Sequence, residues 1–224
     1  MRLLAVFSIF LALAAPIWGM SDKSAEPVSQ PSCLSTQEGT PILGKPALSA
    51  REIYDYVMTR RPGPAFTLEL VQEYLDQGKR WGIRADVAIF QAIVETGWFR
   101  FEGGTAVTPD DHNYCGLGVT RRGAKGCVFA TVADGVSAHL QHLWAYATDR
   151  PLPDGWELVD PRFRYVRRGI APTWQSLGSG AWATSTNYPS LILRLFPAPD
   201  PEAESTPTPV PASPAPVAPY TLYD

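Results

Sequence analysis

This 224-residue chain has a small net charge, few cysteines and no apolar run of membrane-spanning length. The formal net charge is −3, so no basic surface favours a nucleic-acid partner. The three cysteines include no CxxC pair, and a set of His112, Cys115 and Cys127 has no evident fourth ligand, which argues against zinc. We expect no metal and no organic cofactor. The apolar run from Leu3 to Trp18 has 16 residues, short of the roughly 20 that a membrane span needs.

That run is typical of a secretion signal. Arg2 precedes it and small residues close it, which predicts an export signal over residues 1–20, with an uncleaved anchor as the alternative. We expect an exported protein, located in the periplasm, the cell envelope or outside the cell. Residues 21–47 are polar with scattered Pro and Gly, as in a linker. Nine prolines at positions 197–219 predict an extended or disordered tail over residues 197–224, which leaves one domain over residues 48–196.

Hydrophobic periodicity predicts that this domain is mainly α. Ser49 and Glu52 have the spacing of a capping box, Thr67 can cap a second helix, and Gly82 can end it. Further helices are expected over residues 85–96, 132–147, 174–177 and 188–196. The turn-rich segment 116–131 predicts a short β-hairpin.

Cys115 and Cys127 flank the tip of this predicted hairpin. Two strands joined there could place the thiols opposite each other, so we expect a disulfide, as is common in exported proteins. Unpaired thiols are the main alternative. Cys33 is left over, in the linker.

Glu95 is the only charged residue between Asp86 and Arg100, and its neighbours are apolar. A lone carboxyl group among apolar side chains resists ionisation, because its charged form loses hydration. A carboxylic acid that stays protonated near neutral pH can protonate the leaving oxygen of a sugar, so this pattern favours a glycosidase. Gln91 lies four residues earlier and shares a helix face with Glu95, which leaves a narrow solvated stripe as the alternative.

Four motifs over residues 65–196 resemble the glucosaminidase family, the endo-β-N-acetylglucosaminidase domains of bacterial autolysins and flagellar muramidases. They are AIVETGWFRF around Glu95, HNYCGLG at residues 112–118, FATVADGVSAHLQHL, and AWATSTNYPSLI at residues 181–192. The resemblance implies a lysozyme-like helical domain with a small β-hairpin beside the active-site cleft. It also implies that Glu95 is the catalytic acid.

The same resemblance implies roles for five further residues. Tyr188 would act near the acetamide or the anomeric centre, and Asn113, Gly116, Trp182 and Asn187 would contact the substrate. That substrate would be the glycan of peptidoglycan, cleaved at the β-1,4 bond between N-acetylglucosamine and N-acetylmuramic acid. We expect a monomer with no protein partner.

A second catalytic carboxylate is not evident. The segment from His112 to Ala133 has no Asp or Glu, and Asp110, Asp111 and Asp134 border it. The acetamide oxygen of the substrate is an alternative nucleophile, known from substrate-assisted glycosidases. A lytic transglycosylase, or a glycan-binding module without activity, therefore remains open.

A pair of histidines and a group of arginines are each expected to have a structural role and not a catalytic one. His139 and His142 are three residues apart, without a third ligand, so we expect core or surface histidines. The arginines between positions 162 and 168 predict a solvated face, with contact to the stem-peptide carboxylates of peptidoglycan as the alternative.

Overall fold

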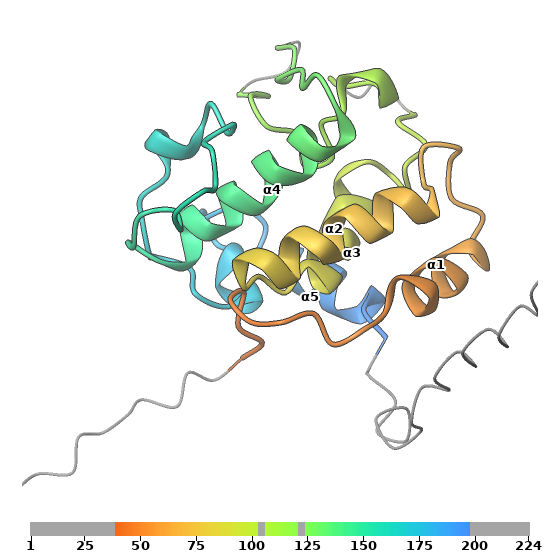
Figure 1. Ribbon diagram of the computed structural model, residues 1–224, viewed down its shortest axis with the longest axis horizontal. Coiled ribbons are helices and arrows are strands. Elements are labelled where there is room, and N and C mark those ends of the chain that lie inside the picture. Colours follow the sequence, from red (N-terminus) through yellow and green to blue (C-terminus); the bar gives the residue numbers. More distant parts are fainter. Residues whose placement is uncertain (1–38, 103–105, 121–123, 198–224) are drawn as a thin grey trace, which may run out of the picture. The chain divides into compact units, whose positions relative to one another are not determined.

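The computed structural model describes residues 39–102, 106–120 and 124–197, and these form a mainly helical domain (Figure 1). Its α-helices and 3₁₀ turns are α1 (Ala50–Met58), α2 (Leu68–Trp81), α3 (Ala85–Glu95), η1 (Pro109–Asp111), α4 (Val132–Ala147), η2 (Phe163–Tyr165), η3 (Trp174–Leu177) and α5 (Tyr188–Leu195). Strand pairing within the described ranges is limited to two isolated bridges, Pro41–Thr173 and Leu43–Ile83. The predicted fold class, mainly α, is confirmed.

Some predictions lie outside these residues. The secretion signal, Cys33, most of the linker and all but the first residue of the tail are among them. The end of the predicted linker is part of the fold, because Ile42 is fully buried and its carbonyl accepts the Arg84 N–H at 2.9 Å. In the described part of the chain, no helix is both long and apolar enough to cross a membrane.

Local capping explains where the helices begin. Ser49 and Glu52 form the predicted capping box of α1, and the Thr67 hydroxyl accepts the Leu70 N–H at the start of α2. Gly82 ends α2 with a φ of 72°, a left-handed conformation that glycine adopts at little cost.

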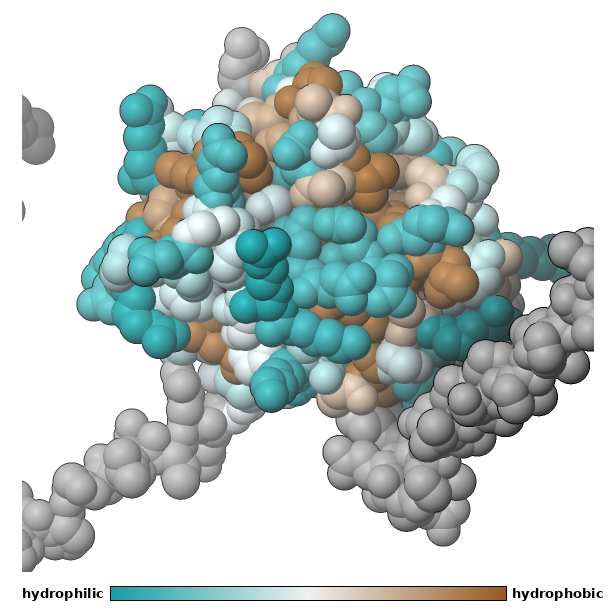
Figure 2. All heavy atoms as spheres, in the orientation of Figure 1, coloured by the Kyte–Doolittle hydropathy of each residue, from teal (hydrophilic) through white to brown (hydrophobic). Residues whose placement is uncertain are grey.

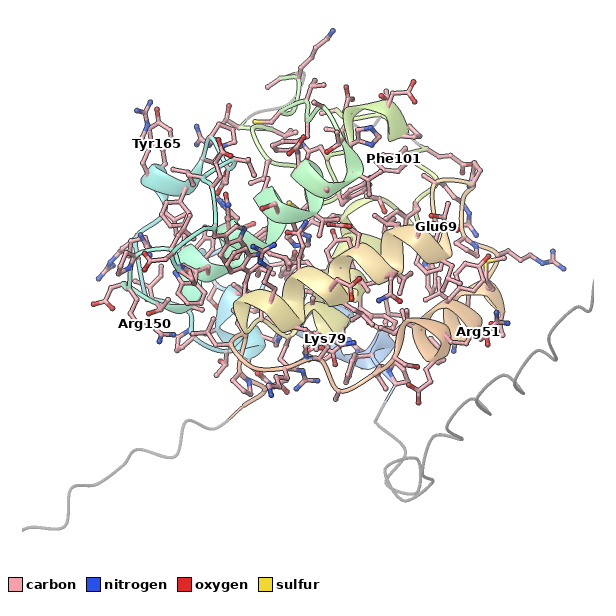
Figure 3. All side chains as sticks on the ribbon, in the orientation of Figure 1. Arg51, Glu69, Lys79, Phe101, Arg150 and Tyr165 are labelled. Carbon is pink, nitrogen blue, oxygen red and sulfur yellow. The ribbon has the colours of Figure 1, made fainter. Side chains whose placement is uncertain are left out.

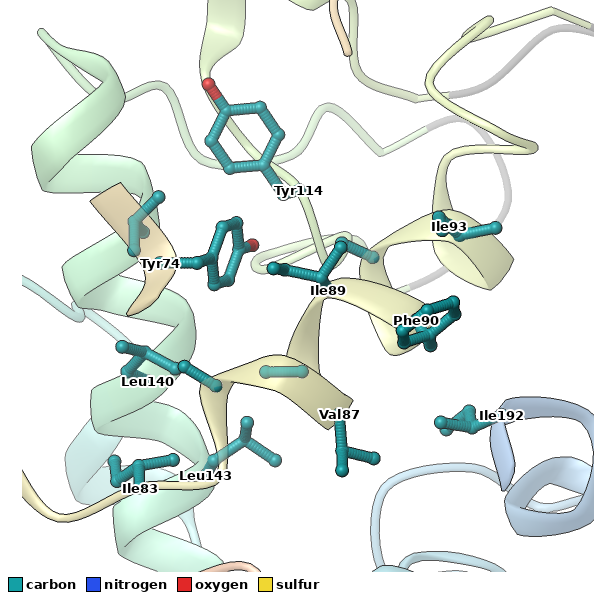
Figure 4. Packing of buried hydrophobic residues seen from close by; sticks show 14 of the residues in the cluster. Tyr74, Ile83, Val87, Ile89, Phe90, Ile93, Tyr114, Leu140, Leu143 and Ile192 are labelled. Atoms are coloured by element: carbon teal, nitrogen blue, oxygen red, sulfur yellow. The ribbon is translucent and has the colours of Figure 1, made fainter. Parts of the chain in front are cut away.

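Helix α3 is the centre of the domain. Its residues from Ala85 to Ile93 are all buried, and it packs against α2 and α5. Figure 4 shows Ile192 of α5 opposite Phe90 of α3, with Tyr74 and Leu140 approaching from α2 and α4. By contrast, hydrophilic side chains cover the outer face of α2 (Figure 2). A helix that is apolar on every side can be stable only in such a buried position.

The described residues do not show the predicted hairpin. Residues 116–120 and 124–131, the described part of that segment, hold no strand, and one backbone hydrogen bond joins Cys127 N–H to the Leu117 carbonyl at 2.7 Å. Gly116 and Gly118 have φ values of 70° and 84°, which interrupt an extended strand. The Asn113 side chain donates to the carbonyl groups of Leu117 and Cys127, both at 2.9 Å. In a β-hairpin such carbonyl groups would accept hydrogen bonds from the opposite strand.

The predicted disulfide is not formed either, and both Cys115 and Cys127 are free thiols. The Cys127 sulfur packs against Gly118, where an added Cβ would lie 2.6 Å from it. The prediction assumed a strand pair that would oppose the two thiols, and the described residues of this segment form no strand.

Candidate active site

Glu95 is the last residue of α3, so its side chain leaves the core where the helix stops. The helix ends because the Thr96 hydroxyl donates back to the Ala92 carbonyl at 2.7 Å and accepts the Phe99 N–H at 2.9 Å. Residues 97–99 follow with φ values of 59°, 64° and 56°. A left-handed turn at two non-glycine residues is strained, and such strain is common beside functional sites.

Two donors converge on one oxygen of Glu95. The Trp182 indole N–H donates to Oε1 at 3.0 Å, and the Tyr188 hydroxyl donates to the same atom. Burial raises the pKa of Glu95, while the hydrogen bonds from Tyr188 and Trp182 lower it by less, so the pKa stays above its ordinary value. Because Oε1 accepts both hydrogen bonds, a bound proton belongs on Oε2, for which no donor lies among the described residues.

A chain of buried hydrogen bonds continues from Tyr188 into the core. The Gln91 amide donates to the Tyr188 hydroxyl at 2.8 Å. The Gln91 carbonyl oxygen lies 3.0 Å from His139 Nε2, and His139 Nδ1 lies 2.8 Å from the Tyr74 hydroxyl. Tyr74, Gln91 and His139 are fully buried. We call Tyr74, His139, Gln91 and Tyr188 the buried relay.

The hydrogen bonds of the buried relay all donate in the direction from Tyr74 toward Glu95. Burial, with a smaller effect of His142, lowers the pKa of His139 to about 3, so the ring is neutral and carries one N–H. The Gln91 oxygen can only accept, which assigns that N–H to Nε2 and makes Nδ1 the acceptor for Tyr74. With the Gln91 amide already donating to it, the Tyr188 hydroxyl keeps its own proton for Glu95.

Gln91 is buried, so it does not form the solvated stripe that the sequence left open. His139 lies in the core, one of the two settings that the sequence predicted for it. The signal for Gln91 was its position four residues before Glu95, on the same helix face. Tyr74 gave no signal, because it reads as one more apolar residue of α2.

A pocket of about 250 Å³ lies beside Trp182, and we call it the Trp182 pocket. The loop of residues 115–120 forms one wall, and Tyr146, Arg162 and Trp182 contribute to the others. Trp182 both lines this pocket and donates to Glu95, so this side chain connects the pocket to the carboxyl group, although Glu95 itself is not part of the lining.

The other predicted substrate residues lie in different settings. Gly116 lines the Trp182 pocket. Asn113 is fully buried, and its amide is engaged with the backbone of its own loop. Asn187 is exposed just before α5, and its side chain has no hydrogen bond within the described residues.

The candidate second acids are not brought to this site. Asp111 Oδ2 accepts the Thr108 N–H at 2.7 Å and Asp134 Oδ2 accepts the Thr131 hydroxyl at 2.8 Å, so both serve as local caps. Asp110 is exposed. Among the residues with described positions, no aspartate or glutamate lines the Trp182 pocket.

Comparison with known proteins agrees with the sequence motifs. The chain matches the model of the glucosaminidase family, described as mannosyl-glycoprotein endo-beta-N-acetylglucosaminidase, over residues 71–198. It is also 37% identical over 119 residues to an uncharacterized protein of Borreliella burgdorferi, a match that covers 53% of this chain and 56% of that relative. No solved structure matches significantly. Because the family match covers more than half of the sequence, this chain belongs to the glucosaminidase family.

Proposed function

We propose that this chain is an endo-β-N-acetylglucosaminidase that hydrolyses the β-1,4 bond between N-acetylglucosamine and N-acetylmuramic acid in peptidoglycan. The observation that carries the proposal is Glu95, a half-buried carboxyl group with a raised pKa and two donors on one oxygen. Cell-wall glycan lies outside the cytoplasmic membrane, so the proposed activity requires the export that residues 1–20 predict.

In the proposed mechanism, Glu95 donates the proton on Oε2 to the leaving glycosidic oxygen. General acid catalysis of this kind contributes about 10² to 10⁴ in rate. Tyr188 and Trp182 hold Oε1, which leaves Oε2 free to face the substrate. They also stabilise the carboxylate that forms after proton transfer.

The nucleophile is proposed to be the acetamide oxygen of the substrate. Two-carboxylate glycosidases use a second acid about 5 to 9.5 Å from the first. Among the described residues, no aspartate or glutamate lines the Trp182 pocket, where the glycan is proposed to bind. The two internal segments that are not described, residues 103–105 and 121–123, are Gly-Gly-Thr and Arg-Arg-Gly and contain no acid. Attack by the acetamide, followed by water, retains the anomeric configuration, so NMR of the first product should show the β-anomer. An initial α-anomer would contradict this mechanism.

Zymography on cell-wall gels tests the proposed activity. The wild type should clear the gel, Glu95→Gln should not, and Glu69→Gln should match the wild type, because Glu69 is exposed on the outer face of α2 (Figure 3). Reducing N-acetylglucosamine ends in the digest would support the hydrolase. Anhydro-muramic ends would indicate a transglycosylase instead, and binding without clearing by the wild type would indicate a module without activity.

A further inference from the structure

Arg162 brings an unpaired positive charge to the Trp182 pocket. Its side chain is half-buried, and its guanidinium lies 4.4 Å from the centre of the Tyr165 ring. Within the described ranges this guanidinium forms no ion pair and donates no hydrogen bond. The backbone N–H of Arg162 donates to Asp160 at 2.7 Å, which fixes the start of this side chain.

Neighbouring arginines are arranged differently. Arg168 donates to the carbonyls of Thr148 and Arg150 at 3.2 and 2.6 Å. Arg164 is exposed, donates to the Tyr165 hydroxyl at 2.8 Å, and does not line the pocket. Figure 3 shows Tyr165 at the outer edge of the structure. Arg162 is therefore the member of this basic cluster that faces the pocket.

The rest of the pocket suits a negatively charged sugar. His142 lines it and uses Nδ1 to bind the buried carboxylate of Asp160 at 2.7 Å, which leaves Nε2 without a partner among the described residues. Trp182 and Tyr146 add aromatic surface, which stacks well on sugar rings. Arg162 lines the pocket and no aspartate or glutamate does. A carboxylate bound there would therefore meet no repelling acid in the lining and could bind a guanidinium group.

We propose that the Trp182 pocket is an acidic-sugar subsite in which Arg162 binds a carboxylate carried by an N-acetylmuramyl residue next to the scissile bond. This inference rests on the proposed function, because it places that residue beside Glu95. The carboxylate comes from the lactyl group in strands without peptides and from the stem peptide in strands that bear them. A mannosyl-glycoprotein core has no such carboxylate, so Arg162 selects peptidoglycan over that class of substrate.

Calorimetry with the full chain tests the subsite. The Glu95→Gln protein is titrated with peptide-free N-acetylglucosamine–N-acetylmuramic acid oligosaccharides, with their lactyl methyl esters, and with peptide-bearing oligosaccharides. Arg162→Gln is added to this background, and Arg164→Gln serves as the matched control. Thermal melting verifies that each variant is folded, and Arg162→Lys provides a second variant that keeps the charge.

Arg162→Gln should weaken binding of the free acid about tenfold, the loss of one charge-assisted contact. The methyl ester should bind the parent about tenfold more weakly than the acid and should not respond to Arg162→Gln. Arg164→Gln should stay within about twofold of the parent, and Arg162→Lys should lie between the parent and Arg162→Gln. An effect with peptide-bearing oligosaccharides alone assigns the carboxylate to the stem peptide.

An unchanged affinity in Arg162→Gln for both acidic ligands, the peptide-free acid and the peptide-bearing oligosaccharides, would overturn the subsite. Tighter binding of a mannosyl glycopeptide than of the acidic oligosaccharides would do the same. These results are independent of cleavage. If the acid binds through Arg162 while the wild type leaves glycan uncut, the hydrolase proposal fails and the subsite stands.

Discussion

Tyr188→Phe offers a quantitative test of how the protein sets the acidity of Glu95. The substitution removes the hydroxyl that donates to Oε1 and leaves Trp182 as the remaining donor at 3.0 Å. A hydrogen bond to a charged group contributes about 1.5 to 3 kcal/mol, and one pKa unit corresponds to about 1.4 kcal/mol. Because this hydrogen bond favours the ionised form, its loss should raise the pKa of Glu95 by about 1 to 2 units.

The assay is the pH dependence of kcat/KM on soluble glycan strands, which reports the essential groups of the free enzyme. Glu95 must be protonated to act as a general acid, so activity falls as pH rises through its pKa. The alkaline limb in Tyr188→Phe should therefore move about 1 to 2 units upward, even if kcat decreases. Tyr114→Phe is the control, because Tyr114 is buried but makes no hydrogen bond to Glu95. A limb that stays in place or moves downward would refute the reasoning.

Three further predictions concern the relay, the thiols and the energetic cost of the acid. Gln91→Leu should lower the free energy of unfolding by about 1 to 3 kcal/mol in urea titrations, because it leaves a buried histidine N–H unpaired. Gln72→Leu, on the surface, should have little effect. Equal stability of the two variants would count against the relay. Reductant should leave the melting temperature unchanged, because Cys115 and Cys127 are free, and a clear drop would show that they pair. A raised pKa of Glu95 means that its stabilising contribution is present below the unfolded pKa and lost as pH rises through the folded pKa. The melting temperature of Glu95→Gln relative to the wild type should therefore be higher at pH 8 than at pH 4, and a relative melting temperature that is lower at pH 8 would contradict the direction of the shift.

The sequence predicted those parts of the fold that depend on local signals. Ser49 and Thr67 cap helices where capping chemistry places them, and Gly82 ends α2 where a left-handed residue is needed. Glu95 stood out because one carboxyl group in an apolar helix is unusual. Each of these features is decided by residues within a few positions along the chain.

Features that depend on distant residues were missed. Gln91 and His139 are 48 positions apart, so periodicity cannot show that they share a hydrogen bond. The segment after residue 115 has the composition of a hairpin tip, but its described residues form a loop in which Gly116 and Gly118 have positive φ values and no strand is paired. The Asn113 side chain then holds the loop, a role that the family motif did not distinguish from substrate binding.

The position of Arg162 shows the same limit. Four arginines in seven residues predicted a solvated face, and Arg164 fits that expectation. Asp160 accepts the backbone N–H of Arg162 and binds His142 of α4, and these contacts join residues that lie far apart in the sequence.

Digestion of purified peptidoglycan in ¹⁸O-labelled water, followed by mass spectrometry, tests the central claim most directly. The account predicts one ¹⁸O atom at each new reducing N-acetylglucosamine end with the wild type, and no new ends with folded Glu95→Gln. Unlabelled anhydro-muramic ends, or undiminished release of products by Glu95→Gln, would contradict it.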